Sequence, residues 1–155
     1  MPNKSYGILF SDIGDDCGKF YFPIKLSSLA YGDMPQFFGG TINAGETKLT
    51  ALIREAKEES NDQVVVLSLG TKIHSANVLG STYNFYVVTS FTGTHFVGDL
   101  KGNNEMASIQ EFTVTTGGDG SMEDLMNKLR VTPSEDFSSS ETYAAFEKAI
   151  DWSQR

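Results

Sequence analysis

Three glutamates crowd the run REAKEES, at Glu55, Glu58 and Glu59. In an α-helix, side chains spaced i, i+3 and i+4 project from the same side. Carboxylates this close raise one another's pKa values unless a cation compensates. Hard divalent cations such as Mg²⁺ bind oxygen ligands of this kind. The spacing therefore fits two interpretations, a platform for a divalent metal or a solvated charged face of a helix.

A helix must position these glutamates, and the sequence predicts one over residues 46–60. Apolar residues recur there at the spacing of one buried stripe, at Leu49, Leu52, Ile53 and Ala56. The glutamates should lie beside that stripe, neither on the core side nor opposite it. Upstream, QFF leads into Gly39 and Gly40, where a strand should end in a tight turn. We expect this turn to lie beside the glutamates and to let a phosphate ligand approach the backbone.

The run from Gly40 to Asp62 resembles the Nudix box, G-x5-E-x7-R-E-U-x-E-E-x-G-U, in which U is aliphatic. Six positions match at the required spacing: Gly40, Glu46, Arg54, Glu55, Glu58 and Glu59. A chance match at six fixed positions in this chain has a probability of about one in 10⁵. The resemblance therefore outweighs the solvated-face interpretation. It covers 23 residues, and the order of elements predicted around them is also similar to the family's.

Two positions at the end of the box depart from the pattern. Asn61 replaces the family's glycine, and Asp62 replaces its final aliphatic residue. Asparagine tolerates the left-handed conformation, so Asn61 can end the helix as glycine would. Asp62 indicates a more exposed loop, and it leaves open a weakened or altered site.

The resemblance implies a reaction and a set of roles. Nudix proteins use Mg²⁺ or Mn²⁺ to hydrolyse a pyrophosphate linkage in a nucleoside diphosphate derivative. By resemblance, Glu58 and Glu59 are the principal metal ligands, and Glu55 is a further ligand or the group that orients or deprotonates water. The resemblance also gives Arg54 a pairing role toward a box glutamate, Glu46 a structural role, and the Gly40 carbonyl access to the metal.

Beyond the box, Glu105 is the first candidate for an additional catalytic acid or base, and Glu111 is the second. The expected substrate contacts are Gly39, Gly40, Phe37 and Tyr83. Tyr83 and Tyr86 both fit the alternating strand equally well. Phe20, Phe22, Tyr31 and Phe91 could also stack on a base, although most of these rings are expected in the core. His74 and His95 are expected to be strand and loop residues, and His95 could touch substrate.

The identity of the substrate is left open between several classes. ADP-ribose-like or dinucleotide compounds are favoured over dinucleoside polyphosphates and nucleoside triphosphates. The alternative is a module on a Nudix scaffold that binds or senses a nucleotide without cleaving it, since fold does not fix function.

The strand and helix pattern predicts an α/β protein with one domain over residues 1–155. Strands are expected at 5–11, 19–24, 63–69, 71–78, 81–91 and 108–116, and further helices at 122–129 and 141–152. Strands interleaved with a helix and followed by helices indicate a mixed sheet covered on both faces. This is similar to the α/β/α sandwich of the Nudix family.

The amino-acid composition narrows the range of expected binding partners. The formal net charge is −8 and Lys and Arg are scattered, which disfavours a polymeric nucleic acid as partner. A single cysteine, Cys17, and the lack of a long apolar segment favour a cytoplasmic protein without a membrane partner. A small nucleotide is the expected partner, and by analogy with the family a homodimer is also open.

Overall fold

A computed structural model describes residues 3–14, 16–30, 32–93, 95–115, 127 and 140–154. Its strands are β1 (Lys4–Gly14), β2 (Cys17–Lys25), β3 (Phe38–Thr41), β4 (Val65–Val66), β5 (Thr71–Val78), β6 (Ser81–Val88), β7 (Phe91–Thr92), β8 (Gly98–Asp99) and β9 (Met106–Thr115). Its helices are α1 (Lys48–Glu58) and α3 (Ser140–Ser153).

The main sheet of the described residues has seven strands, in the order β5-β6-β1-β2-β9-β8, with β3 paired to β1. Strand β1 is its centre. Its first half lies parallel to β6, from Lys4 opposite Tyr83 to Leu9 opposite Val88, and antiparallel to β3. Its second half continues antiparallel to β2. The sheet is therefore mixed, and β4 pairs with β7 in a separate two-stranded sheet.

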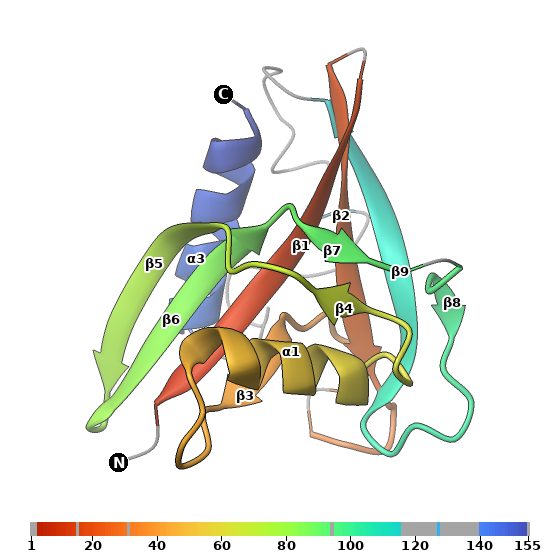
Figure 1. The fold of residues 1–155 in the computed structure, drawn as a ribbon. Helices are drawn as coiled ribbons and strands as arrows, with labels where there is room; N and C mark the ends of the chain where they lie inside the picture. Colours follow the sequence, from red (N-terminus) through yellow and green to blue (C-terminus); the bar gives the residue numbers. More distant parts are fainter. Residues whose placement is uncertain are drawn as a thin grey trace.

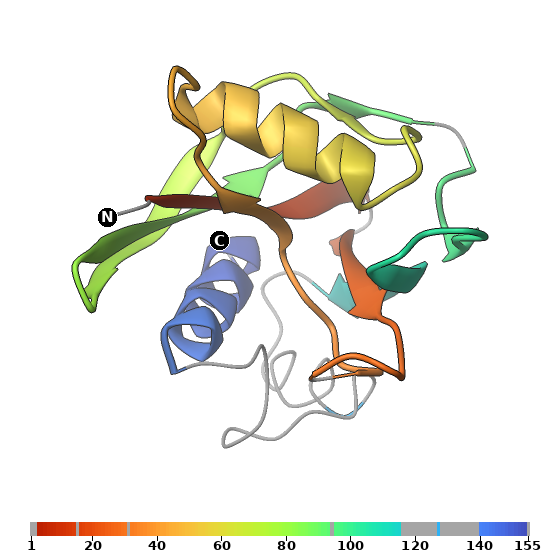
Figure 2. The same ribbon diagram turned by 90° about the horizontal axis from the view of Figure 1, so that it is seen from below.

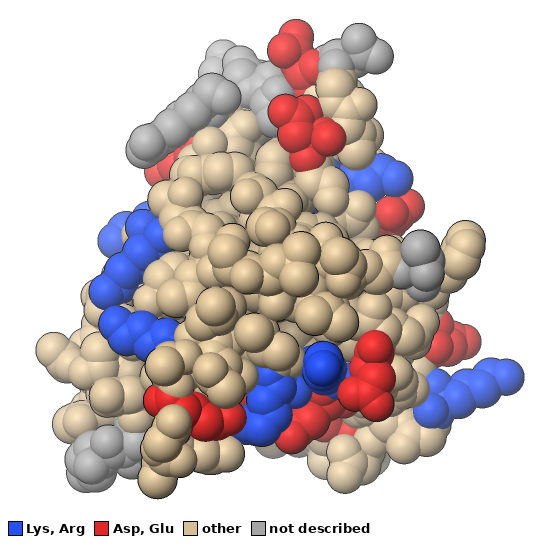
Figure 3. Space-filling model, in the orientation of Figure 1, with Lys and Arg blue, Asp and Glu red and all other residues tan. Residues whose placement is uncertain are grey.

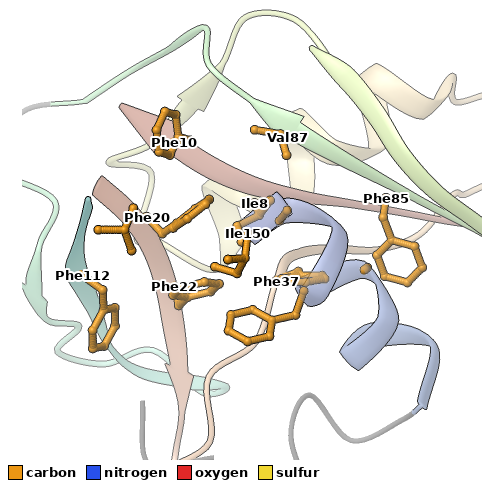
Figure 4. Close-up of a cluster of buried hydrophobic side chains, with 13 residues drawn as sticks. Ile8, Phe10, Phe20, Phe22, Phe37, Phe85, Val87, Phe112 and Ile150 are labelled. Atoms are coloured by element: carbon orange, nitrogen blue, oxygen red, sulfur yellow. The ribbon is translucent and has the colours of Figure 1, made fainter. Parts of the chain in front are cut away.

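Helices cover both faces of the main sheet. Figure 2 shows α1 on one face and α3 on the other, and Figure 1 shows β4 and β7 on the same side as α1. Each face has its own core. The core under α3, drawn in Figure 4, is rich in phenylalanine and includes Phe20, Phe22, Phe85 and Phe146. The core under α1 includes Leu9, Leu52, Ala56 and Val88. This is the predicted α/β/α sandwich with a mixed sheet, and that prediction is confirmed.

Most predicted elements agree with the structure. The β1–β2 hairpin, β5, β9 and α3 lie where the pattern predicts them, within a few residues. The strand predicted over 63–69 is wrong in extent, because only Val65 and Val66 pair with another strand. The strand predicted over 81–91 ends at Val88 and resumes briefly as β7. The helix predicted over 122–129 lies, apart from residue 127, outside the described residues, as does Tyr31.

Within the described part of the chain, neither helix combines the length and the apolar character needed to cross a membrane.

Candidate active site

Helix α1 is shorter than predicted because the residues at its ends have other partners. Thr47 caps the helix, and its hydroxyl accepts a hydrogen bond from Thr50 N at 3.1 Å. Glu46 lies before the cap, and its carboxylate accepts a hydrogen bond from Asn43 N at 2.8 Å. At the other end, Asn61 and Asp62 have φ of 54° and 64° and are exposed. The left-handed conformation predicted for Asn61 and the exposure predicted for Asp62 are confirmed.

Arg54 connects the start of the box to its middle. Its Nε and Nη2 donate to the two carboxylate oxygens of Glu46 at 2.8 and 3.1 Å. Nη2 also donates to the Thr41 carbonyl at 2.9 Å, and Nη1 donates to Glu55 Oε1 at 3.0 Å. A planar fork of donors is suited to this bidentate contact. The pairing expected of Arg54 and Glu46 is therefore present, and it fixes the side chain of Glu55.

The two glycines at the start of the box let the glutamates approach β3. Gly39 has φ of +130°, and a Cβ there would lie 2.1 Å from the Ser5 carbonyl oxygen of β1. Its N–H donates to Glu59 Oε1 at 2.8 Å. A Cβ at Gly40 would lie 2.9 Å from Glu55 Oε1. Both positions are thus occupied by backbone alone, directly against two carboxylates.

The three glutamates differ in burial, contrary to the single shared face that helical spacing predicts. Glu58 has a side chain 59% exposed, that of Glu55 is 15% exposed, and Glu59 is 3% exposed overall. Glu59 keeps helical backbone geometry at the cap and follows Leu52 and Ala56 along the buried side of α1, where its carboxylate meets Gly39 N. Glu58 lies 3.4 Å from Arg54 Nη1 at the surface. Figure 3 shows acidic and basic side chains gathered along the edge of the molecule that α1 occupies.

Glu105 lies beside the buried end of this set. It is half-buried just before β9, and it lies close enough to Glu59 to influence the pKa of that carboxyl. Burial raises the pKa of Glu59 well above its usual range, and the charges of Glu105 and Glu55 raise it further. The structure therefore brings the predicted residue from outside the box to the box glutamates.

The pKa of Glu55 is also raised. Burial is the main cause, the hydrogen bond from Arg54 opposes it, and the charges of Glu58 and Glu105 add to it. The site thus concentrates negative charge while a single described cation, Arg54, contacts it.

Sequence reasoning missed Tyr6. It pairs with Gly39 across β1 and β3, and burial raises the pKa of its hydroxyl, with Tyr83 and then Glu59, Glu55 and Glu105 contributing. Its ring centroid lies 6.2 Å from that of Tyr83. Tyr83 is therefore a neighbour of Tyr6, and both rings pack against the core under α3. The alternating run SYGILFS contained no signal for this, because the proximity arises from sheet register.

Phe37 does not have the position expected of a substrate contact. It is 5% exposed, and its ring packs against those of Phe22 and Phe85 in the core. Figure 4 draws it among the buried side chains of that cluster. We therefore leave Phe37 out of the proposed substrate contacts. Phe20, Phe22 and Tyr86 are likewise buried, and Phe91 packs against the core under α1.

The remaining candidates lie elsewhere. Glu111 is exposed on β9 and pairs with Lys19 at 3.3 Å, so the structure favours Glu105 over Glu111. His74 joins β5 to α3, with Nδ1 2.7 Å from Lys148 Nζ and Nε2 3.5 Å from Glu141 Oε1. His95 lines a surface hollow together with Tyr21, Phe96 and Glu111.

The donor set fits a divalent cation in its chemistry. Carboxylate and carbonyl oxygens are the ligands of Mg²⁺ and Mn²⁺, and Glu59 and Glu55 face Gly39 and Gly40 with raised pKa values. Among the described residues, no three acidic, histidine or cysteine side chains already converge as a metal cage. Glu58 must therefore turn from Arg54 toward the other glutamates if all three are to bind one ion.

No protein-family model matches the sequence, and no curated protein sequence matches it. Several solved structures match the fold of the chain. A MutT Nudix hydrolase from Burkholderia pseudomallei aligns at a TM-score of 0.57 and 13% identity, over 92% of this chain and 97% of the other. The chain has the Nudix fold.

Two further structures share the Nudix fold with this chain. A hydrolase of ADP compounds aligns at a TM-score of 0.57 and 20% identity, over 97% of this chain and 72% of its own. An Ap4A hydrolase from C. elegans, solved as a binary complex, aligns at a TM-score of 0.55 and 13% identity, over 98% of this chain and 97% of its own. Identities this low establish the fold, and the roles of the side chains rest on the geometry above.

Replacing Arg54 by lysine tests the bracing of the Nudix box. A lysine cannot hold Glu46 with two parallel bonds while reaching Thr41 and Glu55. Because Arg54 is partly exposed, we expect Arg54→Lys to lower the free energy of unfolding by only about 1 kcal/mol. Urea denaturation measures this. Lys57→Arg, the reverse exchange at an exposed position of α1, should have no effect, and equal stability of both variants would contradict the bracing role.

The pH dependence of stability tests the buried carboxyls of the Nudix fold. The folded pKa of Glu59 is raised, so the metal-free protein should lose stability as pH rises from about 4.5 through that pKa. The raised pKa of Glu55 likewise makes stability fall as pH rises. Glu46 acts oppositely: Arg54 lowers its pKa, so its contribution is lost as pH falls below about 4.5.

Glu59→Gln should flatten the decline above pH 4.5, because the amide oxygen can still accept from Gly39 N and no longer ionises. The decline removed is at most about 1.4 kcal/mol per pH unit for one proton. Urea denaturation in EDTA between pH 4.5 and 8 measures it. Parallel curves for the wild type and Glu59→Gln would show that Glu59 ionises normally.

Proposed function

We propose that the protein is a pyrophosphohydrolase that uses Mg²⁺ or Mn²⁺ to cleave a small nucleoside diphosphate derivative. One observation carries the proposal. The carboxyl groups of Glu59 and Glu55 lie directly against the backbone of Gly39 and Gly40, with Glu105 beside Glu59, and burial raises the pKa of both box glutamates. A divalent cation would compensate the charge that these crowded carboxylates carry when they are ionised.

In this proposal Glu58 and Glu59 would be the principal ligands of the ion, and Glu55 and the Gly40 carbonyl would be further ligands. When bound, the ion neutralises phosphate charge and lowers the pKa of a water. Glu105 accepts the proton that the attacking water releases, because it contacts Glu59 and is half-buried. The water oxygen bonds to one phosphorus, and the bridging oxygen leaves with the other phosphoryl group.

The chain's own scaffold orients these groups. Arg54 holds Glu55 in place through a bond to Oε1, and Glu46 holds Arg54. Gly39 and Gly40 let the Ser5 carbonyl of β1 and the Glu55 carboxylate approach the backbone of β3 closely. Tyr6, whose pKa responds to the charges of the glutamates, and its neighbour Tyr83 provide aromatic rings on which a base or ribose can rest.

For the substrate we favour ADP-ribose-like and dinucleotide compounds, followed by dinucleoside polyphosphates and triphosphates. The similarity to structures described as hydrolases of ADP compounds and of Ap4A supports nucleotides that contain a pyrophosphate. The net charge of −8 argues against a long nucleic acid.

A panel of ADP-sugars, dinucleotides, diadenosine polyphosphates and triphosphates, incubated with Mg²⁺ or Mn²⁺, tests the proposal by chromatography of the products. Cleavage at a pyrophosphate linkage is expected for at least one class, with no cleavage in EDTA. If no compound is cleaved, the proposal fails.

One observation favours a second candidate, a nucleotide-binding module without turnover. Glu58 turns toward Arg54, and no three donors in the described part of the chain form a ready metal cage. Calorimetry with the same panel separates the two candidates. Tight binding of a compound that is never cleaved would favour the module.

A further inference from the structure

Two asparagines form a bridge between the end of α1 and the loop that carries Glu105. We call Asn61 and Asn103 the asparagine bridge. Asn103 Nδ2 donates to the Glu58 carbonyl at 2.9 Å and to Asn61 Oδ1 at 2.9 Å. Asn61 Nδ2 donates to the Lys101 carbonyl at 3.0 Å. The bridge thus joins residues 42 positions apart in the chain.

The oxygen of the Asn103 side-chain amide binds the backbone of Glu105. Asn103 Oδ1 accepts hydrogen bonds from Glu105 N at 2.9 Å and from Met106 N at 2.8 Å. Met106 is buried, and the Glu105 carbonyl accepts from Leu26 N at 3.0 Å. The backbone of Glu105 is therefore fixed on both sides.

The orientation of the Asn103 amide follows from its neighbours. One end faces two acceptors, the Glu58 carbonyl and Asn61 Oδ1, and the other end faces two backbone N–H donors. Both of its N–H groups and both lone pairs of its oxygen are used, which is the full capacity of the side chain. If the amide were flipped, its NH₂ group would face the two backbone N–H donors and its oxygen would face the two acceptors.

We propose that the asparagine bridge is a positioning device that holds the Glu105 carboxyl against Glu59 at the metal-binding end of α1. Asn61 occupies the position where the sequence departs from the Nudix box, and its side chain supplies contacts that a glycine lacks. The inference rests on the proposed function for its link to catalysis. Its link to cation binding needs only the carboxylates, because a charge held close to Glu59 strengthens the attraction for a cation.

The experiment is a double-mutant cycle between Asn103→Ala and Glu105→Gln, read by Mn²⁺ binding in electron paramagnetic resonance. Each single variant should weaken Mn²⁺ binding by about tenfold, as is common when a group that supports a metal site is removed. In the Glu105→Gln background, Asn103→Ala should then change the Mn²⁺ affinity by less than about twofold, because its effect passes through Glu105.

Asn77→Ala is the matched control, since Asn77 is an exposed asparagine that accepts a bond from Thr82 at 2.7 Å on β5, remote in sequence from the box. It should leave Mn²⁺ binding unchanged. If Asn103→Ala disrupts the fold by circular dichroism, Asn61→Gly replaces it in the cycle, because glycine accepts a φ of 54°. Asn61→Gly should also weaken Mn²⁺ binding, but by less than Asn103→Ala does.

Turnover of a cleaved substrate gives a second readout, with kcat expected to fall and KM to change little for Asn103→Ala. The positioning role would be overturned if Asn103→Ala lowered the Mn²⁺ affinity equally in the wild-type and Glu105→Gln backgrounds. It would also be overturned if Asn103→Ala did not lower the Mn²⁺ affinity at all. Coupling in Mn²⁺ binding without cleavage of any substrate would overturn the proposed function and leave the positioning role standing.

Discussion

Glu59→Gln is expected to lower kcat for the cleaved substrate by about two to four orders of magnitude, which corresponds to about 3 to 5 kcal/mol of transition-state stabilisation. The substitution keeps the size of the side chain and its acceptor for Gly39 N, at 2.8 Å in the wild type. It removes the negative charge that a bound cation needs. The loss should therefore come from chemistry rather than from folding.

Steady-state kinetics with Mg²⁺ measure this effect, together with circular dichroism to show that the variant is folded. Glu58→Gln should give a loss of similar size, since Glu58 is the other principal ligand in the proposal. Glu147→Gln makes the same change on the exposed side of α3 and should retain wild-type rates. A folded Glu59→Gln variant with the wild-type kcat would refute the proposed mechanism.

Gly39→Ala is expected to destabilise the protein by about 3 kcal/mol or more, in the upper range for single substitutions. Two causes act together. The φ of +130° is unfavourable for any residue with a Cβ, and that Cβ would lie 2.1 Å from the Ser5 carbonyl oxygen. Strand β3 must then move away from β1, and Gly39 N loses Glu59.

Gly98→Ala is a closely matched control. Gly98 has φ of +129°, but a Cβ there would meet nothing within 4 Å. The variant carries the backbone strain without the collision. Urea denaturation of both proteins should show the larger loss for Gly39→Ala, and equal losses would mean that β3 adapts to the extra methyl group.

Local patterns in the sequence were sufficient to predict much of the fold. Alternation predicted β5 and β9, and helical spacing predicted α1 and α3, because each pattern reflects one buried face. The run QVVVLSL failed as a seven-residue strand because a strand also needs a partner. Only Val65 and Val66 pair, and Leu67 is 52% exposed.

The residues of the candidate site were likewise predictable only where the signal is local in the sequence. The box predicted Glu46, Arg54 and the glutamates, whose spacing is local. The burial of Glu59 depends on a bond to Gly39, 20 residues away, and spacing along one helix carries no information about that partner. Glu105 could be named as a candidate only by resemblance. The bond from Asn103 to Asn61 had no sequence signal, since two polar loop residues 42 positions apart are common in any protein.

The parallel pairing of β1 with β6 has a consequence for the order of folding. Asn84 on β6 bonds to the Lys4 carbonyl on β1, 80 positions earlier, whereas β1 and β2 form a local hairpin. Long-range pairing of this kind forms slowly because a large loop must close first. On a ribosome, the hairpin can form early, but α1 lacks the completed sheet on which it packs until Val88 has emerged. In the proposed function, cation affinity therefore develops late and reports the closure of the sheet.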